Sequence, residues 1–184
     1  MKALIIDLGS TKTPEIMDMA ERSGFYAIRF KYRKPWELPD LEGFGAVILS
    51  GAPILITEGK VTEPFKALGQ HLESFAGAVL GICCGHQILG IHDGAEIFRC
   101  EEDRDGQTIR RSTPSRLFQN LGDEFLMIED HCEAITCPPN YRIIASSSVC
   151  ENEAMEHRTM PRFGVQFHPE ISGINGQRLM DNFY

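Results

Sequence analysis

Short runs of apolar, often β-branched residues alternate along the first half of the chain with longer stretches in which apolar residues recur every three or four positions. The first pattern is typical of buried strands and the second of amphipathic helices. The apolar runs predict four strands, at Ala3–Asp7, Tyr26–Phe30, Gly45–Ser50 and Ala78–Ile82. Because helical patterns lie between these strands, the sequence favours βαβ units and a mainly parallel sheet.

Residue types at the ends of the helical stretches help to place the helices. Thr13 is positioned to cap a first helix that has Pro14 at its first position. A second helix is predicted before the fourth strand, where apolar residues share one face: Phe65, Leu68, Leu72 and Phe75. A third helix is predicted directly after the fourth strand, over Gly85–His92.

The second half has strand patterns without long helices between them, at Ala95–Arg99, Phe125–Ile128, Tyr141–Ser146, Ala154–His157 and Phe163–His168. Some of these are expected to be antiparallel additions at the edge of the sheet. We expect the charged stretch Cys100–Arg111 to be a solvated loop or hairpin, and Gln177–Tyr184 to be a short helix. The predicted fold is α/β, a flavodoxin-like, doubly wound, mixed and mostly parallel sheet with antiparallel edge strands, in a single domain over residues 1–184.

Composition narrows the possible partners and locations. The chain has 184 residues, 42% hydrophobic and 24% charged, which suits one globular domain. Its net charge of -8 and the lack of a basic stripe argue against nucleic-acid binding. No apolar run approaches the roughly 20 residues of a membrane span, and the first residues lack a signal-peptide pattern. We therefore expect a cytoplasmic protein with no membrane contact, in which the six cysteines are free thiols.

The residues that indicate chemistry gather around Cys83, in the run Gly81–Gln87 with the form Gly-x-Cys-x-Gly. A strand pattern precedes this run and a helix pattern follows it, so the motif predicts a tight turn in which glycines avoid the crowding of Cβ atoms. Unsatisfied N–H groups at the start of a helix favour a thiolate over a thiol. We predict that Cys83 is a catalytic nucleophile, and the alternative is a buried structural thiol.

A cysteine nucleophile needs a base and a group that orients the base. His168 is the last residue of the final predicted strand and Glu170 lies two positions beyond it, and residues two apart on an extended chain point to the same side. Pro169 cannot continue a sheet ladder, which places the pair where the strand ends. We expect His168 to move protons and Glu170 to hold its imidazole, although a strand-end histidine by itself is more often structural.

An acyl-transfer site also needs N–H donors for the developing oxyanion. In a strand–turn–helix site one donor is the residue after the nucleophile, here Cys84, and the other comes from the loop after the third strand. That loop is the run Leu49–Pro53, in which we assign the backbone of Ala52. A metal site at Cys83, Cys84 and His86 is an alternative that their spacing favours only weakly, and we expect no metal.

The runs Gly81–Gln87 and Gly164–Glu170, with the loop Ser50–Pro53, strongly resemble the motifs of the class I (triad) glutamine amidotransferases. The resemblance covers essentially the whole chain. It implies hydrolysis of the glutamine side-chain amide through a γ-glutamyl thioester on Cys83, with release of ammonia. It also implies a set of groups that hold the glutamine: Gly51, Gln87 and the backbone around His131, Cys132 and Glu133.

Within the family, the stretch Ala145–His157 looks most like the GMP synthetase branch, in the form of a free-standing glutaminase subunit. That likeness implies a partner, an ATP pyrophosphatase subunit that converts XMP to GMP, with ATP and Mg²⁺ on the partner only and no cofactor in this chain. Two alternatives stay open: a stand-alone γ-glutamyl hydrolase, and a non-catalytic regulator that binds glutamine or a synthetase. The chain departs from the family pattern at three places: Leu8–Ser10, in a stretch where Asp-x-Gly-Gly-Gln is usual, Ala52, where a second Gly is common, and Ser172-Gly173, where a His-Thr pair is typical.

Overall fold

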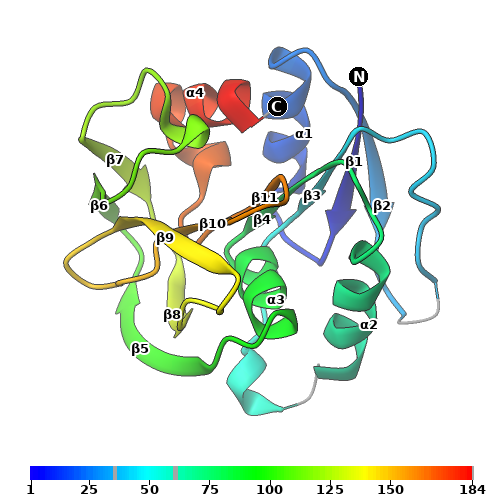
Figure 1. The fold of residues 1–184 in the computed structure, drawn as a ribbon, viewed down its shortest axis with the longest axis horizontal. Coiled ribbons are helices and arrows are strands. Elements are labelled where there is room, and N and C mark those ends of the chain that lie inside the picture. The colour runs from blue at the N-terminus through cyan, green and yellow to red at the C-terminus, as the bar shows by residue number, and fades with distance from the viewer. Residues whose placement is uncertain (35–36, 60–61, 184) are drawn as a thin grey trace.

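The computed structural model describes residues 1–34, 37–59 and 62–183. Its centre is a nine-stranded mixed sheet with the strand order β2-β1-β3-β4-β11-β10-β9-β6-β7 (Figure 1). The first five strands in this order are parallel: β2 (Tyr26–Lys31), β1 (Lys2–Asp7), β3 (Ala46–Leu49), β4 (Ala78–Ile82) and β11 (Arg162–Val165). With β11 in fifth place, the order is the 2-1-3-4-5 arrangement of flavodoxin-like sheets, which confirms the predicted fold class.

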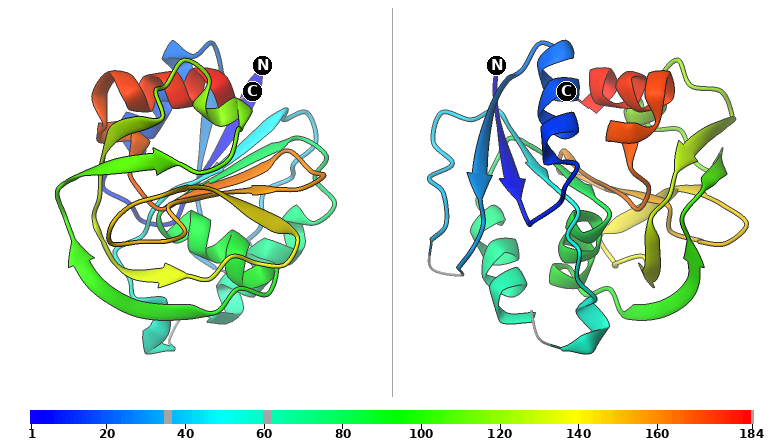
Figure 2. Two further views of the ribbon diagram at one scale, coloured as in Figure 1. Left: turned by 60° about the vertical axis from the view of Figure 1, so that its left-hand side comes forward. Right: turned by 180° about the vertical axis from the view of Figure 1, so that it is seen from behind.

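The remaining strands of the sheet are antiparallel, as the expectation of antiparallel edge strands required. They are β10 (Ala154–His157), β9 (Tyr141–Ser146), β6 (Gly106–Arg111) and β7 (Glu124–Ile128). Two further strands, β5 (Ile97–Asp103) and β8 (His131–Ile135), pair with each other in a separate small sheet. β5 curves away from the end of the helix that precedes it (Figure 2).

The expectation of a solvated loop or hairpin over Cys100–Arg111 is wrong. β5 and β6 run through this stretch, and β5 pairs with β8 whereas β6 pairs with β7 and β9. Ile109 in β6 is fully buried between more exposed neighbours, so the stretch contributes to the core. β8 was also not predicted from the sequence, because its polar residues His131 and Glu133 are buried instead of facing solvent.

Helices cover both faces of the sheet, as a doubly wound fold requires (Figures 1 and 2). One face carries α1 (Thr13–Arg22) and α4 (Gly173–Phe183), and the other carries α2 (Thr62–Leu72) and α3 (Cys84–His92). The period of two along β1 separates two cores. Ala3 and Ile5 belong to the core under α1 and α4, whereas Leu4 and Ile6 belong to the core under α2.

Short helices complete the described chain: η1 (Ile56–Glu58), η2 (Arg116–Phe118) and η3 (Pro169–Ile171). The C-terminal helix α4 begins at Gly173, ahead of the predicted start at Gln177, and Tyr184 lies outside the described residues. None of the helices within the described ranges is long and apolar enough to cross a membrane.

Asp7, at the end of β1, ties the start of α1 to β2. Its carboxylate accepts hydrogen bonds from the Thr13 hydroxyl (2.9 Å), the Gly9 N–H (2.9 Å) and the Arg29 guanidinium (2.7 and 3.0 Å). Thr13 therefore does not cap α1 as predicted, although Pro14 does lie in the first turn. Burial raises the pKa of Asp7, but the hydrogen bonds outweigh burial and lower the pKa below its ordinary value of 3.8.

The substitution Asp7→Asn is expected to destabilise the fold by about 2 kcal/mol at neutral pH, because it weakens charge-assisted hydrogen bonds to a buried group. A carboxyl whose pKa is lowered by folding stabilises the native state above its ordinary pKa and loses that contribution as the pH falls through the lower folded value. Wild-type stability should therefore decline below about pH 4 more steeply than that of the variant.

Urea unfolding at neutral pH and near pH 3 measures both effects. Asp18→Asn, which changes an exposed carboxylate on α1, is the matched control and should behave as wild type. An identical pH dependence of stability in wild type and Asp7→Asn would contradict the role given to Asp7.

Candidate active site

Cys83 lies at the turn between β4 and α3, in a backbone conformation that few non-glycine residues adopt. Its φ is 49° and its ψ is −106°, and such a conformation costs on the order of 1–3 kcal/mol. The flanking glycines permit the turn: a Cβ on Gly81 would lie 2.4 Å from the Gly85 carbonyl oxygen, and one on Gly85 would lie 2.6 Å from the Leu49 carbonyl oxygen. The predicted strand–turn–helix is confirmed, and the strain points to a functional role for Cys83.

The structure brings His168 and Glu170 to Cys83. Because β11 runs beside β4, the Cys83 N–H donates to the Val165 carbonyl at 2.8 Å, and the His168 ring lies close enough to Cys83 for the cysteine to raise the His168 pKa. Gly51 packs against both residues, since a Cβ there would lie 3.3 Å from His168 Cε1 and 3.7 Å from Cys83 Cβ. His168 Nδ1 lies 2.7 Å from Glu170 Oε1. The three predicted catalytic side chains therefore form one chain of contacts.

The charge state of His168 follows from its two neighbours. Burial lowers the pKa of His168, but the hydrogen bonds and charges of Cys83 and Glu170 outweigh burial and raise the pKa to about 10. The ring is therefore an imidazolium at neutral pH, between a sulfur and a carboxylate. A cationic ring in this place can stabilise a thiolate and can later give a proton to a leaving group.

The backbone of His168 is fixed from two sides. Its N–H donates to the Ile128 carbonyl at 2.8 Å, at the end of β7. The Ser172 hydroxyl donates to the His168 carbonyl at 2.6 Å and accepts the Ile128 N–H at 2.9 Å. Ser172 is one of the departures from the family pattern, and here it links the histidine to the neighbouring strand.

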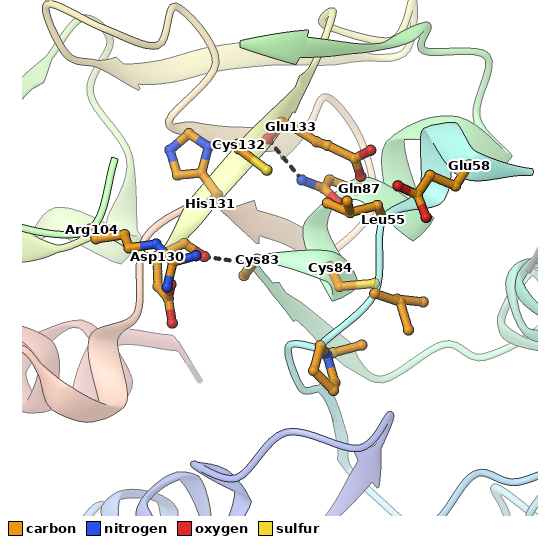
Figure 3. Close-up of a pocket in the computed structure, with 13 residues that line it drawn as sticks. Leu55, Glu58, Cys83, Cys84, Gln87, Arg104, Asp130, His131, Cys132 and Glu133 are labelled. Atoms are coloured by element: carbon orange, nitrogen blue, oxygen red, sulfur yellow. Dashed lines mark hydrogen bonds and ion pairs between the residues drawn. The ribbon is translucent and has the colours of Figure 1, made fainter. Parts of the chain in front are cut away.

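A pocket of about 630 Å³ opens beside Cys83 (Figure 3), which is within the size range of small-molecule sites. The two predicted oxyanion donors line it: Ala52 in the loop after β3, and Cys84 as the first residue of α3. The leading N–H groups of a helix have no partner within the helix. Ala52 is not among the described residues with positive φ, as its Cβ requires. Their role as oxyanion donors stays a prediction.

Four of the residues predicted to hold substrate line this pocket: Gln87, His131, Cys132 and Glu133 (Figure 3). The fifth, Gly51, is not among the lining residues. Gln87 Nε2 donates to the Glu133 carbonyl (3.0 Å) and to Gln166 Oε1 (3.1 Å), so the amide joins α3 to β8. The Glu133 carboxylate accepts the N–H groups at the start of η1, from residues 56 and 57, at 2.8 and 3.0 Å. These two side chains therefore fix the wall of the pocket.

Two contacts to the Cys83 sulfur were not predicted. Gln166 Nε2 lies 3.7 Å from it, and the Asp130 carbonyl oxygen lies 3.9 Å from it. Gln166 precedes His168 by two residues, so the period of two could have placed it on the same side of the strand. The Asp130 contact uses a backbone atom, which no residue type in the sequence marks. Arg104 and Glu58, which also line the pocket, add charged groups to it.

The alternative metal site at Cys83, Cys84 and His86 is not among the converging sets of ligand atoms in the described ranges. His86 is fully buried against Gly164, where a Cβ would lie 2.4 Å from His86 Nδ1. Burial lowers the pKa of His86 to about 3, which keeps the ring neutral. His86 is therefore a packing residue behind the turn.

The comparison with known families agrees with the fold, with the turn at Cys83 and with the pocket beside it. The sequence profile of glutamine amidotransferase class-I matches residues 4–184. The chain belongs to the class I glutamine amidotransferases, a family of glutamine-hydrolysing enzymes.

Its relatives include proteins named as one of the subunits of glutamine-hydrolyzing GMP synthase. The one from Methanococcus aeolicus is 36% identical over 150 residues, which are 80% of this chain and 76% of that protein. The one from Thermococcus kodakarensis is 32% identical over 140 residues, 74% of this chain and 72% of that protein.

Solved structures show the same fold. The crystal structure of a Thermoplasma acidophilum protein, assigned to the same GMP synthase component, superposes with a TM-score of 0.88, at 24% identity, over 100% of this chain and 92% of that chain. A glutamine amidotransferase from Thermotoga maritima superposes with a TM-score of 0.78, at 20% identity, over 98% and 81% of the two chains.

The raised pKa of His168 can be tested by titration. In the wild type the ring is expected to stay protonated at neutral pH and to lose its proton at a pH of about 10. Cys83→Ala removes one of the two groups that raise the pKa, so the midpoint should fall by about one pH unit or more. Nitrogen-15 NMR of the imidazole measures the midpoint directly. Cys137→Ala, a thiol outside the pocket, is the control, and an unmoved midpoint in Cys83→Ala would rule out the contact.

Proposed function

We propose that this chain hydrolyses the side-chain amide of glutamine through a γ-glutamyl thioester on Cys83 and delivers the ammonia to a synthetase partner. The observation that supports this most is the chain of contacts from Cys83 through His168 to Glu170 at the edge of a pocket large enough for an amino acid. Membership of the class I amidotransferases supports the same chemistry.

In the first half-reaction the Cys83 sulfur forms a bond to the amide carbon of glutamine. The bond from that carbon to nitrogen breaks, and His168 gives its proton to the nitrogen, which leaves as ammonia. In the second half-reaction the neutral His168 takes a proton from water while the water oxygen attacks the thioester carbon. The carbon–sulfur bond breaks, glutamate leaves and the imidazolium is restored. Glu170 stabilises that cation through its contact of 2.7 Å with Nδ1.

The oxyanion of both half-reactions is assigned to the N–H groups of Ala52 and Cys84, which line the pocket together with Cys83. Donors held by a loop and a helix start need no reorganisation when the charge develops. Gly51, Gln87 and the backbone of residues 131–133 are assigned to the glutamine itself. The pocket position of Gln87 and of His131, Cys132 and Glu133 supports this assignment.

The names of the relatives support a specific acceptor. Because proteins at 36% and 32% identity are named as a component of glutamine-hydrolyzing GMP synthase, we assign the partner as an ATP pyrophosphatase subunit that converts XMP to GMP. Hydrolysis by this chain then needs no cofactor, and ATP and Mg²⁺ bind to the partner. All six cysteines are free thiols, which fits the reducing cytoplasm, and we place the reaction there.

The nucleophile is tested with a glutamine analogue that alkylates thiols. Labelling is expected on Cys83, located by mass spectrometry of the digested protein, and glutamine should protect against it. Cys83→Ala should lower kcat/KM for glutamine hydrolysis by about 10³-fold or more, since it removes the attacking atom. Cys137→Ala is the matched control and should retain activity. Labelling elsewhere, or activity that survives in Cys83→Ala, would overturn the proposal.

The partner is tested by steady-state ammonia release in the presence and absence of the ATP pyrophosphatase. Ammonia made without an acceptor is wasted, so activity alone should be slow and should rise by about tenfold or more when the partner, ATP and XMP are added. Full activity without a partner, together with turnover of γ-glutamyl peptides, would identify a stand-alone γ-glutamyl hydrolase. Glutamine binding without turnover, unaffected by Cys83→Ala, would identify a regulator.

A further inference from the structure

A second cluster of polar side chains lies in the segment Ile128–His131, which links β7 and β8, and in the loop before β10. Glu129, His131 and Glu153 are 1%, 8% and 0% exposed, respectively. One ligand atom of each lies within 4.8 Å of the corresponding atoms of the other two. Asp103, which pairs with His131 across β5 and β8, is also buried and near this cluster.

The carboxylates of this cluster have few partners in contact with them. Both carboxylate oxygens of Glu129 and of Glu153 are buried without a hydrogen-bond partner, and so is one oxygen of Asp103. Within the described residues no lysine or arginine forms an ion pair with any of these three carboxylates. Burying an uncompensated carboxylate costs several kcal/mol, so acidic groups gathered here require a cation or a proton.

The hydrogen bond that His131 makes shows which of its ring nitrogens faces the two carboxylates. His131 Nδ1 lies 3.1 Å from the Glu133 carbonyl oxygen, which can only accept, so Nδ1 carries the hydrogen. Nε2 then presents its lone pair, and it lies 3.5 Å from Glu129 Oε2 without a hydrogen-bond partner. Two acceptors facing each other repel unless a cation lies between them. A histidine that donates one N–H to a backbone carbonyl and points the other nitrogen at carboxylates is the arrangement of a metal ligand.

We propose that Glu129, His131 and Glu153 bind one divalent transition-metal ion, with Zn²⁺ as the representative. Two carboxylates and an imidazole suit Zn²⁺ or Mn²⁺ better than Ca²⁺ or Mg²⁺, which prefer oxygen ligands alone. The expectation of no metal in this chain rested on cysteine spacing, and it did not weigh these three residues. Binding at this cluster is independent of the proposed reaction.

The site would hold the wall of the pocket in place. The link between β7 and β8 contacts both partners of the catalytic pair: the Ile128 carbonyl accepts the His168 N–H, and the Asp130 carbonyl contacts the Cys83 sulfur. Glu129 lies between these two carbonyls in the sequence, and His131 follows them. A metal ion that joins this link to Glu153 would therefore fix the backbone around Cys83 and stabilise the folded state.

The competing explanation is that a proton balances the cluster. Burial and the neighbouring Glu153 raise the pKa of Glu129, and burial raises that of Glu153, so one carboxyl could stay protonated and hydrogen-bond to the other. The experiment must therefore distinguish an ion from a proton.

Protein stripped with a chelator is titrated with Zn²⁺ and, separately, with Mn²⁺, which has little affinity for the free thiols. One ion per chain is expected for each metal by elemental analysis after gel filtration, with a higher thermal unfolding temperature. Glu153→Gln should weaken binding by about 100-fold or more, because loss of a group that only orients a metal ligand already costs about 10–100-fold. Glu151→Gln, an exposed carboxylate on the same loop, is the matched control and should bind as wild type.

X-ray absorption of the wild-type Zn²⁺ complex gives a test that does not depend on a variant folding. Nitrogen and oxygen ligands at about 2.0–2.2 Å are expected, and a shell dominated by sulfur at about 2.3 Å would place the ion on cysteines instead. Three results would each overturn the proposal. They are a sulfur-dominated shell, a failure to bind either metal at millimolar concentration, and undiminished binding in a folded Glu153→Gln variant. Failure to bind would leave the proton as the balancing charge.

Discussion

The pairing of β4 with β11 is the constraint on which the site depends. These strands are distant in the sequence, and their parallel register sets Ile82 opposite Val165, so both strands end at the same edge of the sheet. The N–H of Cys83 then donates to the Val165 carbonyl, which fixes the first residue after β4 to the last residue of β11. A shift of this register by one residue would turn the side chains after β11 to the other face and separate His168 from Cys83.

The strain at Cys83 is maintained by contacts around the turn. Because Gly81 and Gly85 approach neighbouring backbone within distances that no Cβ would allow, the strand, turn and helix pack closely enough to hold the cysteine at positive φ. The cost of on the order of 1–3 kcal/mol is small against the burial of β4 and α3 in the two cores. The strained conformation keeps the sulfur at the edge of the pocket, where the His168 ring can reach it.

The sequence predicted the site best where the residues that carry the chemistry also determine the local backbone structure. The turn around Cys83 follows from glycine spacing, and the pair His168 and Glu170 follows from the end of a strand marked by Pro169, so both could be predicted. The predicted strand was too long, because β11 ends at Val165 and Glu170 lies in η3 instead of on an extended chain. β8 could not, because its polar side chains are buried, which reverses the pattern by which strands are found. The sequence also could not predict which carbonyl would face the Cys83 sulfur, because backbone contacts depend on how β7 packs against η3 and β8 against α3.

Buried polar side chains connect the catalytic residues to the link between β7 and β8. An apolar link between β7 and β8 would pack without cost, yet the link that supplies carbonyls to both Cys83 and His168 also holds Glu129 and His131 in the interior. Whatever balances that charge must remain in place for the link to stay folded, since a buried carboxylate without a counter-charge would draw water into the wall. The geometry of the pocket therefore depends on the electrostatic balance behind it as well as on the sheet beneath it.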